Sequence, residues 1–582
     1  MPPPTLTFIY GPTIRTGCND ASLVRSHLMR KQHQEKRRRI QIPKSTSNKN
    51  KERNLLICQC AISRQPPPRS SSSSSSTRTI HPRHASSELV FAACPKRHGL
   101  EADNARRLNL HQIAPSQVDP FFPDDRKTTP NFDFLLRECV NVVFPTARPG
   151  EFANRSLQAY LHPDRSPMVM QSMLYSALLH LHVLPILRGI PSSVAAELAG
   201  SYTIQRLRIK GAVMNQVRQR LLQVDSTNIH QDQVEDVVMS VLYLASNEHL
   251  ESIRRPEQGP FSPPFRTLQS MEYYGSCEVH PLHWQTVQHI IEQRGGIHTL
   301  KLYGLGWLVS VSGVISAINS DCKPPFPIVY PDGKPVIYRA PLQAFGIQQP
   351  PRHATLRSHG FQQLALLHPP VKGTIIRVLL DLSEMAQALN HLAGERCGDR
   401  LLTLIGDIRV TVVHRLCSLP NEREHPRPTL IFHKRDCTPE QPLQTATTIY
   451  IVARKSALLY TVNVVLPLPQ TSLLRRKMTL GIQEYMLQLP CDPKEKGRRR
   501  SCPPAELEIL LWCSVVAGIC ADSTLYPDTR AWFVAQARTF CRRLGISSWE
   551  EELLVLLQSF CWLDSASDEA GRAFWSEMGP SA

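Results

Sequence analysis

From Phe132 onward, apolar residues recur at spacings of three and four, which is the period of an amphipathic α-helix. The period is clear in residues 168–184, in residues 193–224 and from Val234 to Leu244. Alternating apolar and polar runs are scarce, and hairpin turns of the Asn-Gly type are lacking. The sequence therefore predicts an all-α fold built as a large multi-helix domain.

The sequence also predicts where helices end and where loops lie. An apolar stripe of Val287, Ile290 and Ile291 stops at Gly295-Gly296, a pair typical of a helix C-terminus. The β-branched run from Thr447 to Val452 sits inside a longer helix-like window, so we assign it to a helix. Four stretches heavy in proline or charge predict loops: residues 252–266, 322–370, 418–445 and 490–504.

The charge of the chain is concentrated at its N-terminal end. Residues 1–115 hold 20 Lys and Arg against 6 Asp and Glu, a net charge of +14 out of +18 for all 582 residues. The remaining part is nearly neutral. Such a cationic arm suits nucleic acid, nuclear import or an acidic protein surface as its partner.

Residues 21–40 contain neither glycine nor proline and predict one basic helix, capped by Asn19 or Asp20 and ended by Pro43. A helix of this length spans about 30 Å, long enough to lie along a DNA groove. Its cations are the candidate contacts for nucleic acid phosphates or for the nuclear import machinery, with a merely solvated arm as the alternative. They are Arg25, Arg30, Lys31, Lys36, Arg37, Arg38 and Arg39.

The next stretch is a linker by composition. It contains three consecutive prolines from Pro66 and an unbroken serine run from Ser70 to Ser76, with little periodic apolar sequence. We therefore expect a basic N-terminal segment over residues 1–45, a disordered linker over 46–125 and a helical domain over 126–582. Arginine and serine in the arm leave a mitochondrial transit peptide as a minor alternative to the nucleus.

Signatures of catalysis and of membrane insertion are lacking in the sequence. There is no phosphate-binding P-loop, no Gly-x-Ser-x-Gly elbow and no His-Glu-x-x-His helix. Gly304-Leu305-Gly306 lacks the third glycine of a dinucleotide-binding turn. The most apolar run, residues 509–521, is too short to cross a bilayer. We assign no catalytic, cofactor or metal residue and expect a protein that is not an enzyme and does not enter a membrane.

Histidines and cysteines offer weaker candidates. His180, His182 and His289 lie in apolar helical stretches, where a core or rim histidine is more common than a general base. The sixteen cysteines are scattered singly, which favours reduced thiols. Possible zinc ligands in the linker lack the paired spacing of a structural site: Cys58, Cys60, His81, His84, Cys94 and His98.

Four stretches, taken in order, give the chain a recognisable pattern. The first is Phe8-Ile-Tyr-Gly-Pro with the basic run to Arg39, and the second is the helix of residues 168–184. The third is Ile290-Ile-Glu-Gln-Arg-Gly-Gly-Ile, with the later Asp321-Cys-Lys-Pro-Pro-Phe-Pro. The fourth is the aromatic tail, with Leu510-Leu-Trp, Trp532-Phe-Val, Trp549, Phe560-Cys-Trp-Leu-Asp and Phe574-Trp-Ser-Glu.

In this order the stretches resemble the fungal-specific transcription factor domain, in the variant often labelled tachykinin-like. The resemblance covers about residues 1–40 and 130–577. It implies an α-helical regulatory domain, a nuclear location and a role in transcriptional control. One departure concerns DNA binding: the zinc binuclear cluster that begins Cys-x2-Cys-x6-Cys is missing, so no zinc ligands are carried over.

The leading hypothesis is a nuclear transcriptional regulator that either contacts DNA through the basic arm or acts through a DNA-bound protein. A helical scaffold that binds other proteins is one alternative. An enzyme with an unfamiliar helical active site is another. Target genes, activation or repression, any small ligand and the oligomeric state are left open at this stage.

Overall fold

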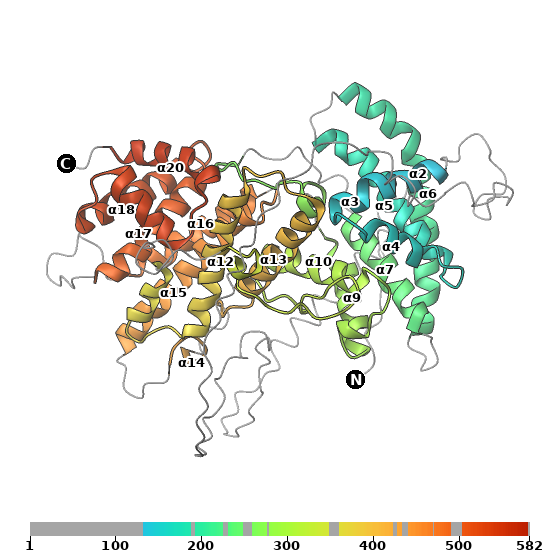
Figure 1. The fold of residues 1–582 in the computed structure, drawn as a ribbon, viewed down its shortest axis with the longest axis horizontal. Helices are drawn as coiled ribbons and strands as arrows, with labels where there is room; N and C mark the ends of the chain where they lie inside the picture. The colour runs from blue at the N-terminus through green and yellow to red at the C-terminus, as the bar shows by residue number, and fades with distance from the viewer. Residues whose placement is uncertain are drawn as a thin grey trace, which may run out of the picture. The chain divides into compact units, whose positions relative to one another are not determined.

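The structure is a computed structural model, and Figure 1 shows its helices. It describes residues 132–187, 192–224, 231–247, 259–275, 279–347, 360–422, 428–433, 440–469, 471–489 and 503–579. Of these residues 75% are helical, in 19 α-helices and shorter turns. No strand forms among them, and only the isolated bridges Val329 to Pro335 and Val371 to Phe432 have β pairing. The predicted all-α fold is confirmed.

The first helices of the described chain pack around α5, whose residues are apolar on nearly every side. Helix α5 contacts α6 and α7 along its length and is almost wholly buried. The predicted helices at 168–184 and 193–224 are both confirmed with small shifts at their ends. The bounds are α2 (Phe132–Glu138), α3 (Phe144–Ala147), α4 (Phe152–Tyr160), α5 (Pro167–Leu187), α6 (Ser192–Val224) and α7 (Gln231–Asn247), with a π turn at Cys139–Val143.

The middle of the chain alternates helices with irregular segments. Helix α9 ends where the sequence predicts, because Gly295 and Gly296 adopt φ of 95° and 112°, which favours glycine. Helices α12 and α13 pack against each other. The bounds are α8 (Met271–Tyr274), α9 (Pro281–Gln293), α10 (Leu305–Ser320), α11 (Pro341–Ala344), α12 (Gly373–Leu392) and α13 (Asp399–Cys417), with 3-10 turns at Leu268–Ser270, Ile297–Thr299 and Gly360–Leu366.

The C-terminal helices pack around α17, which is buried from Ile509 to its end at Cys520. Helix α17 contacts α15 and α18 most extensively, and the ring of Phe574 lies against the backbone of Gly518. None of the helices in the described residues is long and apolar enough to span a membrane. The bounds are α14 (Pro428–Ile431), α15 (Glu440–Tyr460), α16 (Ser472–Leu487), α17 (Pro504–Cys520), α18 (Pro527–Leu544), α19 (Leu554–Phe560) and α20 (Asp564–Met578), with π turns at Thr461–Val465 and Trp549–Leu553.

The loop predictions are correct in part. The short helix α14 lies within the predicted loop at 418–445, and helix α15 begins at Glu440, so that prediction is wrong at residues 428–431 and 440–445. Pro442 falls in the first turn, where a backbone N–H has no partner within the helix, and Glu440 favours a helix N-terminus. The β-branched run from Thr447 to Val452 lies within α15, as predicted.

Within the predicted loop at 322–370, the structure has the short helix α11 and a 3-10 turn. The other described residues there are irregular. The predicted basic helix at 21–40 and the linker at 46–125 lie outside the described residues.

Candidate functional site

The residues predicted to contact nucleic acid lie outside the part of the chain that the structure describes. They are Arg25, Arg30, Lys31, Lys36, Arg37, Arg38 and Arg39. The same holds for the six possible zinc ligands of the linker. Within the described ranges, no group of three or more His, Cys, Asp or Glu side chains could hold a metal ion. The chemistry that the structure does bring together lies in buried charged clusters.

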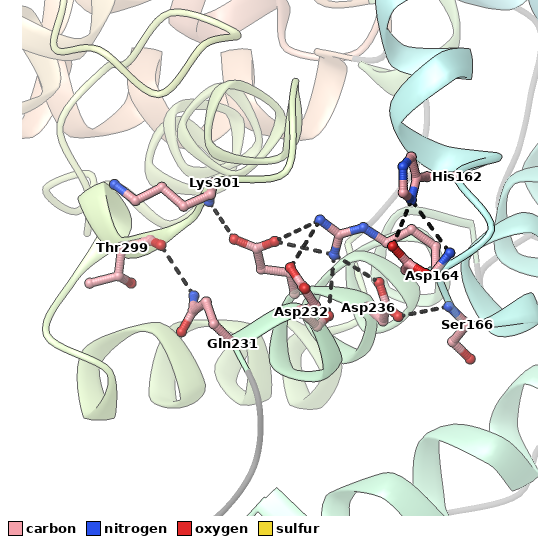
Figure 2. Close-up of polar contacts among 10 residues, drawn as sticks. His162, Asp164, Ser166, Gln231, Asp232, Asp236, Thr299 and Lys301 are labelled. Atoms are coloured by element: carbon pink, nitrogen blue, oxygen red, sulfur yellow. Dashed lines mark hydrogen bonds and ion pairs between the residues drawn. The ribbon is translucent and has the colours of Figure 1, made fainter.

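The first cluster joins the turn before α5 to the start of α7 (Figure 2). Arg165 Nη2 lies 3.3 Å from Glu235 Oε2, and Arg165 Nη1 lies 3.2 Å from Asp236 Oδ1. Both carboxylates are buried, and the arginine is largely shielded from solvent. A single arginine is thus shared by two adjacent buried carboxylates and by the exposed carboxylate of Asp232, whose Oδ1 lies 3.3 Å from Arg165 Nη2.

The same two carboxylates also bind backbone groups of two other segments. Asp236 Oδ2 accepts a hydrogen bond of 2.9 Å from the N–H of Ser166, just before α5 begins. Glu235 Oε1 accepts one from the N–H of Lys301. The cluster therefore fastens α7 to the start of α5 and to the segment that precedes α10.

Each of the four carboxylate oxygens of Glu235 and Asp236 has a donor. Burial raises the pKa of Asp236, while the Ser166 N–H and Arg165 act in the opposite direction. Gln231 adds a further link beside the cluster by donating from Nε2 to the Thr299 carbonyl oxygen at 3.1 Å (Figure 2). A general acid or base needs an oxygen within reach of a substrate, so this arrangement fits a structural junction rather than a reaction centre.

A second cluster surrounds Asp381 of α12. Its carboxylate pairs with Arg415 of α13 and accepts a hydrogen bond of 2.9 Å from Arg377 Nε. Tyr338 donates its hydroxyl to the same carboxylate, and the Arg415 guanidinium lies 3.9 Å over the Tyr338 ring. Glu384, one turn further along α12, pairs with Arg377. These contacts hold the irregular segment before α11 against α12 and α13.

A third cluster lies where α10 ends. Asp321 Oδ1 is 3.4 Å from Arg454 Nη1, and Asp321 Oδ2 is 3.5 Å from Lys455 Nζ. Lys455 Nζ also lies 2.6 Å from Glu422 Oε1. Burial acts to raise the pKa of Asp321, but the two cations outweigh it, and the net shift is downward.

Arg409 of α13 is fully buried and is held by main-chain acceptors. It donates to the carbonyl oxygens of Phe265 and Leu268, at 3.3 and 2.9 Å, and to Gln269 Oε1 at 2.9 Å. Phe265, Gln269 and Ser270 have positive φ, so this segment adopts a strained path around the guanidinium. Burial lowers the pKa of Arg409 to about 9.

The three histidines singled out in the sequence have different surroundings. His180 is buried and stacks on Tyr273 with ring centroids 3.6 Å apart, and burial lowers its pKa to about 3. Burial also lowers the pKa of His182, with a further contribution from Arg206. His289 is exposed on α9. His180 is therefore a neutral core residue at physiological pH.

The eight cysteines in the described part of the chain form no disulfide. Burial raises the pKa of Cys139, Cys417, Cys513 and Cys520 to about 12. Thiols of this kind are protonated and poorly reactive at neutral pH. These cysteines behave as small apolar core residues.

The buried clusters were missed in the sequence, although one of them leaves a signal there. Glu235 and Asp236 interrupt an otherwise apolar helical run that extends to Leu244. Two adjacent acids within such a run point to a buried counter-ion. That counter-ion is Arg165, which lies 70 residues before Glu235 in the chain. Only the tertiary fold brings the two residues together, so the sequence does not identify the pair.

The fold and the clusters define a large all-α protein whose buried charges fasten its helices to one another. Comparison with known protein families, curated proteins and solved structures found no match. The resemblance to the fungal transcription factor domain therefore stays a prediction from the sequence.

Proposed function

We propose that the chain is a nuclear transcriptional regulator of the fungal type. Residues 1–45 serve nuclear import or nonspecific contact with nucleic acid phosphates, and the helical domain of residues 126–582 is the regulatory domain. The observation that carries the proposal is the charge partition, because +14 of the net charge lies in residues 1–115. The cationic segment suits nuclear import or contact with phosphates, and the nearly neutral helical body is then left for the regulatory interactions.

The proposal allows two routes to DNA. In the first, the basic helix at 21–40 contacts phosphates without reading base edges. Its affinity should then fall steeply as salt increases, because each neutralised phosphate releases counter-ions. In the second, the helical domain binds a protein that is itself bound to DNA, and a flat salt response of direct binding would favour this route.

Import is tested by replacing Arg37, Arg38 and Arg39 with alanine in the tagged full-length protein. We expect the triple variant to lose nuclear accumulation. The matched control removes the same charge from the linker by replacing Arg69, Arg78 and Arg83 with alanine, and it should accumulate as the parent does. An import role for the basic run is wrong if the first variant also concentrates in the nucleus like the parent.

A helical scaffold that binds other proteins is the second candidate. An enzyme would need a pocket into which polar groups converge. The cavity lined by Ser246, Tyr274, Val279, Ser312 and Ile315 is about 20 Å³, room for a single water molecule. An enzyme with an unfamiliar helical active site stays open as the other alternative. A scaffold without transcriptional output predicts unchanged transcript levels after deletion of the gene.

A further inference from the structure

One helix of the body exposes a regular row of leucines. On α16, the exposed fractions of Leu473, Leu480 and Leu487 are 77%, 40% and 63%. They are spaced by seven residues, so successive side chains drift by only about 20° around the helix axis. The three leucines form one straight apolar stripe about 21 Å long, which we call the α16 stripe.

Leu473 and Leu487 contribute little to the core of their own chain, whereas Leu480 is partly covered by it. Met478, Ile482 and Met486 lie on the other side of α16 and are buried, where the helix packs mainly on α15. Leucines repeated every seven residues on the outward side of a helix fill one of the two apolar positions of a coiled-coil heptad, while the other position is polar in α16. A row of exposed leucines on one helix face is a candidate protein interaction surface.

The charges beside the stripe indicate its occupant. Lys477 and Glu484 are exposed and project to the same side of the stripe, three residues before and four residues after Leu480. On the other side, Arg476 and Gln483 occupy the matching positions. If two copies of this helix face meet in antiparallel orientation with Leu480 at the centre, Lys477 of one copy lies opposite Glu484 of the other. The face is therefore nearly complementary to itself in charge.

We propose that the α16 stripe binds the α16 stripe of a second copy of this chain, in antiparallel orientation and centred on Leu480. Leu480 then meets Leu480 of the second copy, and Leu473 meets Leu487 of the second copy. Lys477 lies beside Glu484 of the second copy, and two-fold symmetry repeats that ion pair. The inference does not depend on the proposed nuclear function.

The same charges disfavour a parallel pair. In parallel orientation, Lys477 lies beside Arg476 of the second copy, and symmetry repeats this repulsion on the other side of the seam. Like charges at such positions destabilise a helix pair by amounts similar to the gain from opposite charges. The leucines therefore provide the apolar contact between the two helices, and the charges select the antiparallel orientation.

A neighbouring loop extends the apolar surface. The Arg476 guanidinium lies 4.7 Å over the ring of Tyr526, which comes just before α18. Leu525, next to that tyrosine, is 61% exposed. Even with this loop, two four-turn helices bury less than the roughly 1,200–2,000 Å² of a stable interface, so we expect association that is weak and concentration-dependent.

The contact is tested by sedimentation equilibrium of the full-length chain over a concentration series. We expect the parent to shift from monomer to dimer and Leu480→Glu to stay monomeric. The matched control is Leu222→Glu, which places the same charge on an exposed leucine of α6 and should dimerise as the parent does. Circular dichroism checks that all three proteins keep the same helix content. A monomeric parent throughout, or a dimer that Leu480→Glu leaves intact, would overturn the proposal.

The orientation is tested by exchanging the charges. Lys477→Glu and Glu484→Lys each turn two opposite-charge pairs into two like-charge pairs, so we expect each to weaken dimerisation by about tenfold. The double variant restores both pairs and should return to within about threefold of the parent. A double variant no better than the single ones, or a Lys477→Glu variant that dimerises more tightly than the parent, would contradict the antiparallel arrangement.

Discussion

The carboxylate of Asp236 accepts a hydrogen bond from the backbone N–H of Ser166 at 2.9 Å, although the two residues lie 70 positions apart in the chain. Backbone N–H groups at the start of a helix have no partner within it, and a nearby side chain usually caps them. At α5, Ser166 Oγ accepts a hydrogen bond of 3.3 Å from the N–H of Met168, and Asp236 of α7 accepts one from the N–H of Ser166 itself. Arg165 pairs with that carboxylate and with the one beside it, so the start of α5 and the two buried charges of α7 meet at one junction.

Replacing Arg165 with methionine should destabilise the fold strongly. The change leaves the buried carboxylates of Glu235 and Asp236 without their cation, and losing one partner of a buried pair costs about 3–5 kcal/mol. Urea denaturation followed by circular dichroism measures the loss. The control is Arg208→Met on the exposed side of α6, which should stay within about 0.5 kcal/mol of the parent. Equal effects of the two changes would refute the role of the junction.

Replacing Gly518 with alanine should disrupt the packing of α17 on α20. A Cβ atom at Gly518 would lie 2.3 Å from the ring of Phe574, which is closer than real contacts allow. We expect destabilisation of about 1–3 kcal/mol from overpacking. Gly211→Ala on α6 is the opposite case, because nothing lies within 4 Å, and helix propensity should stabilise it by about 1 kcal/mol. Thermal melting of both variants measures whether the melting temperature falls for Gly518→Ala and rises for Gly211→Ala. A higher melting temperature for Gly518→Ala would contradict close packing of Phe574 against Gly518.

Much of the secondary structure was predictable because helical periodicity is a local signal. The bounds of α5 and α6 and the end of α9 at Gly295-Gly296 follow from residues near each site. The start of α15 was misplaced, because Pro442 resembles a loop residue although the first turn of a helix tolerates it. Boundaries of this kind depend on context beyond composition.

The charged clusters were not predictable, because they join segments that are distant in the sequence. The acceptors of Arg409 lie about 140 residues before it and are mostly backbone carbonyl oxygens, which no side-chain pattern reveals. The seven-residue spacing of the leucines on α16 is visible in the sequence, but their exposure is not. Only packing separates a core stripe from a binding face.

Acid should destabilise the protein through His180. Burial lowers the pKa of this histidine to about 3, whereas an unfolded chain titrates near pH 6.5. Between these two pH values the unfolded state binds a proton that the folded state does not. The free energy of unfolding therefore decreases as the pH is lowered, by up to about 1.4 kcal/mol for each pH unit.

His180→Phe removes that proton and keeps a ring to stack on Tyr273. Relative to the parent, the variant should therefore gain about 1.6 kcal/mol of stability when the pH falls from 6.5 to 5. Urea denaturation at the two pH values measures the difference, with His289→Asn on the exposed side of α9 as the control. A parallel pH response of parent and His180→Phe would contradict a buried neutral histidine.

The central claim, that this is a nuclear regulator recruited to chromatin, is tested most directly by crosslinked chromatin occupancy. The tagged full-length protein is compared with a version lacking residues 1–45, at matched expression and with the same import signal added to both. We predict discrete peaks for the full-length protein. Their loss on deletion would assign DNA contact to the basic segment, and their retention would assign recruitment to the helical domain and a partner. An absence of peaks from both proteins would contradict the account and favour a scaffold or an enzyme.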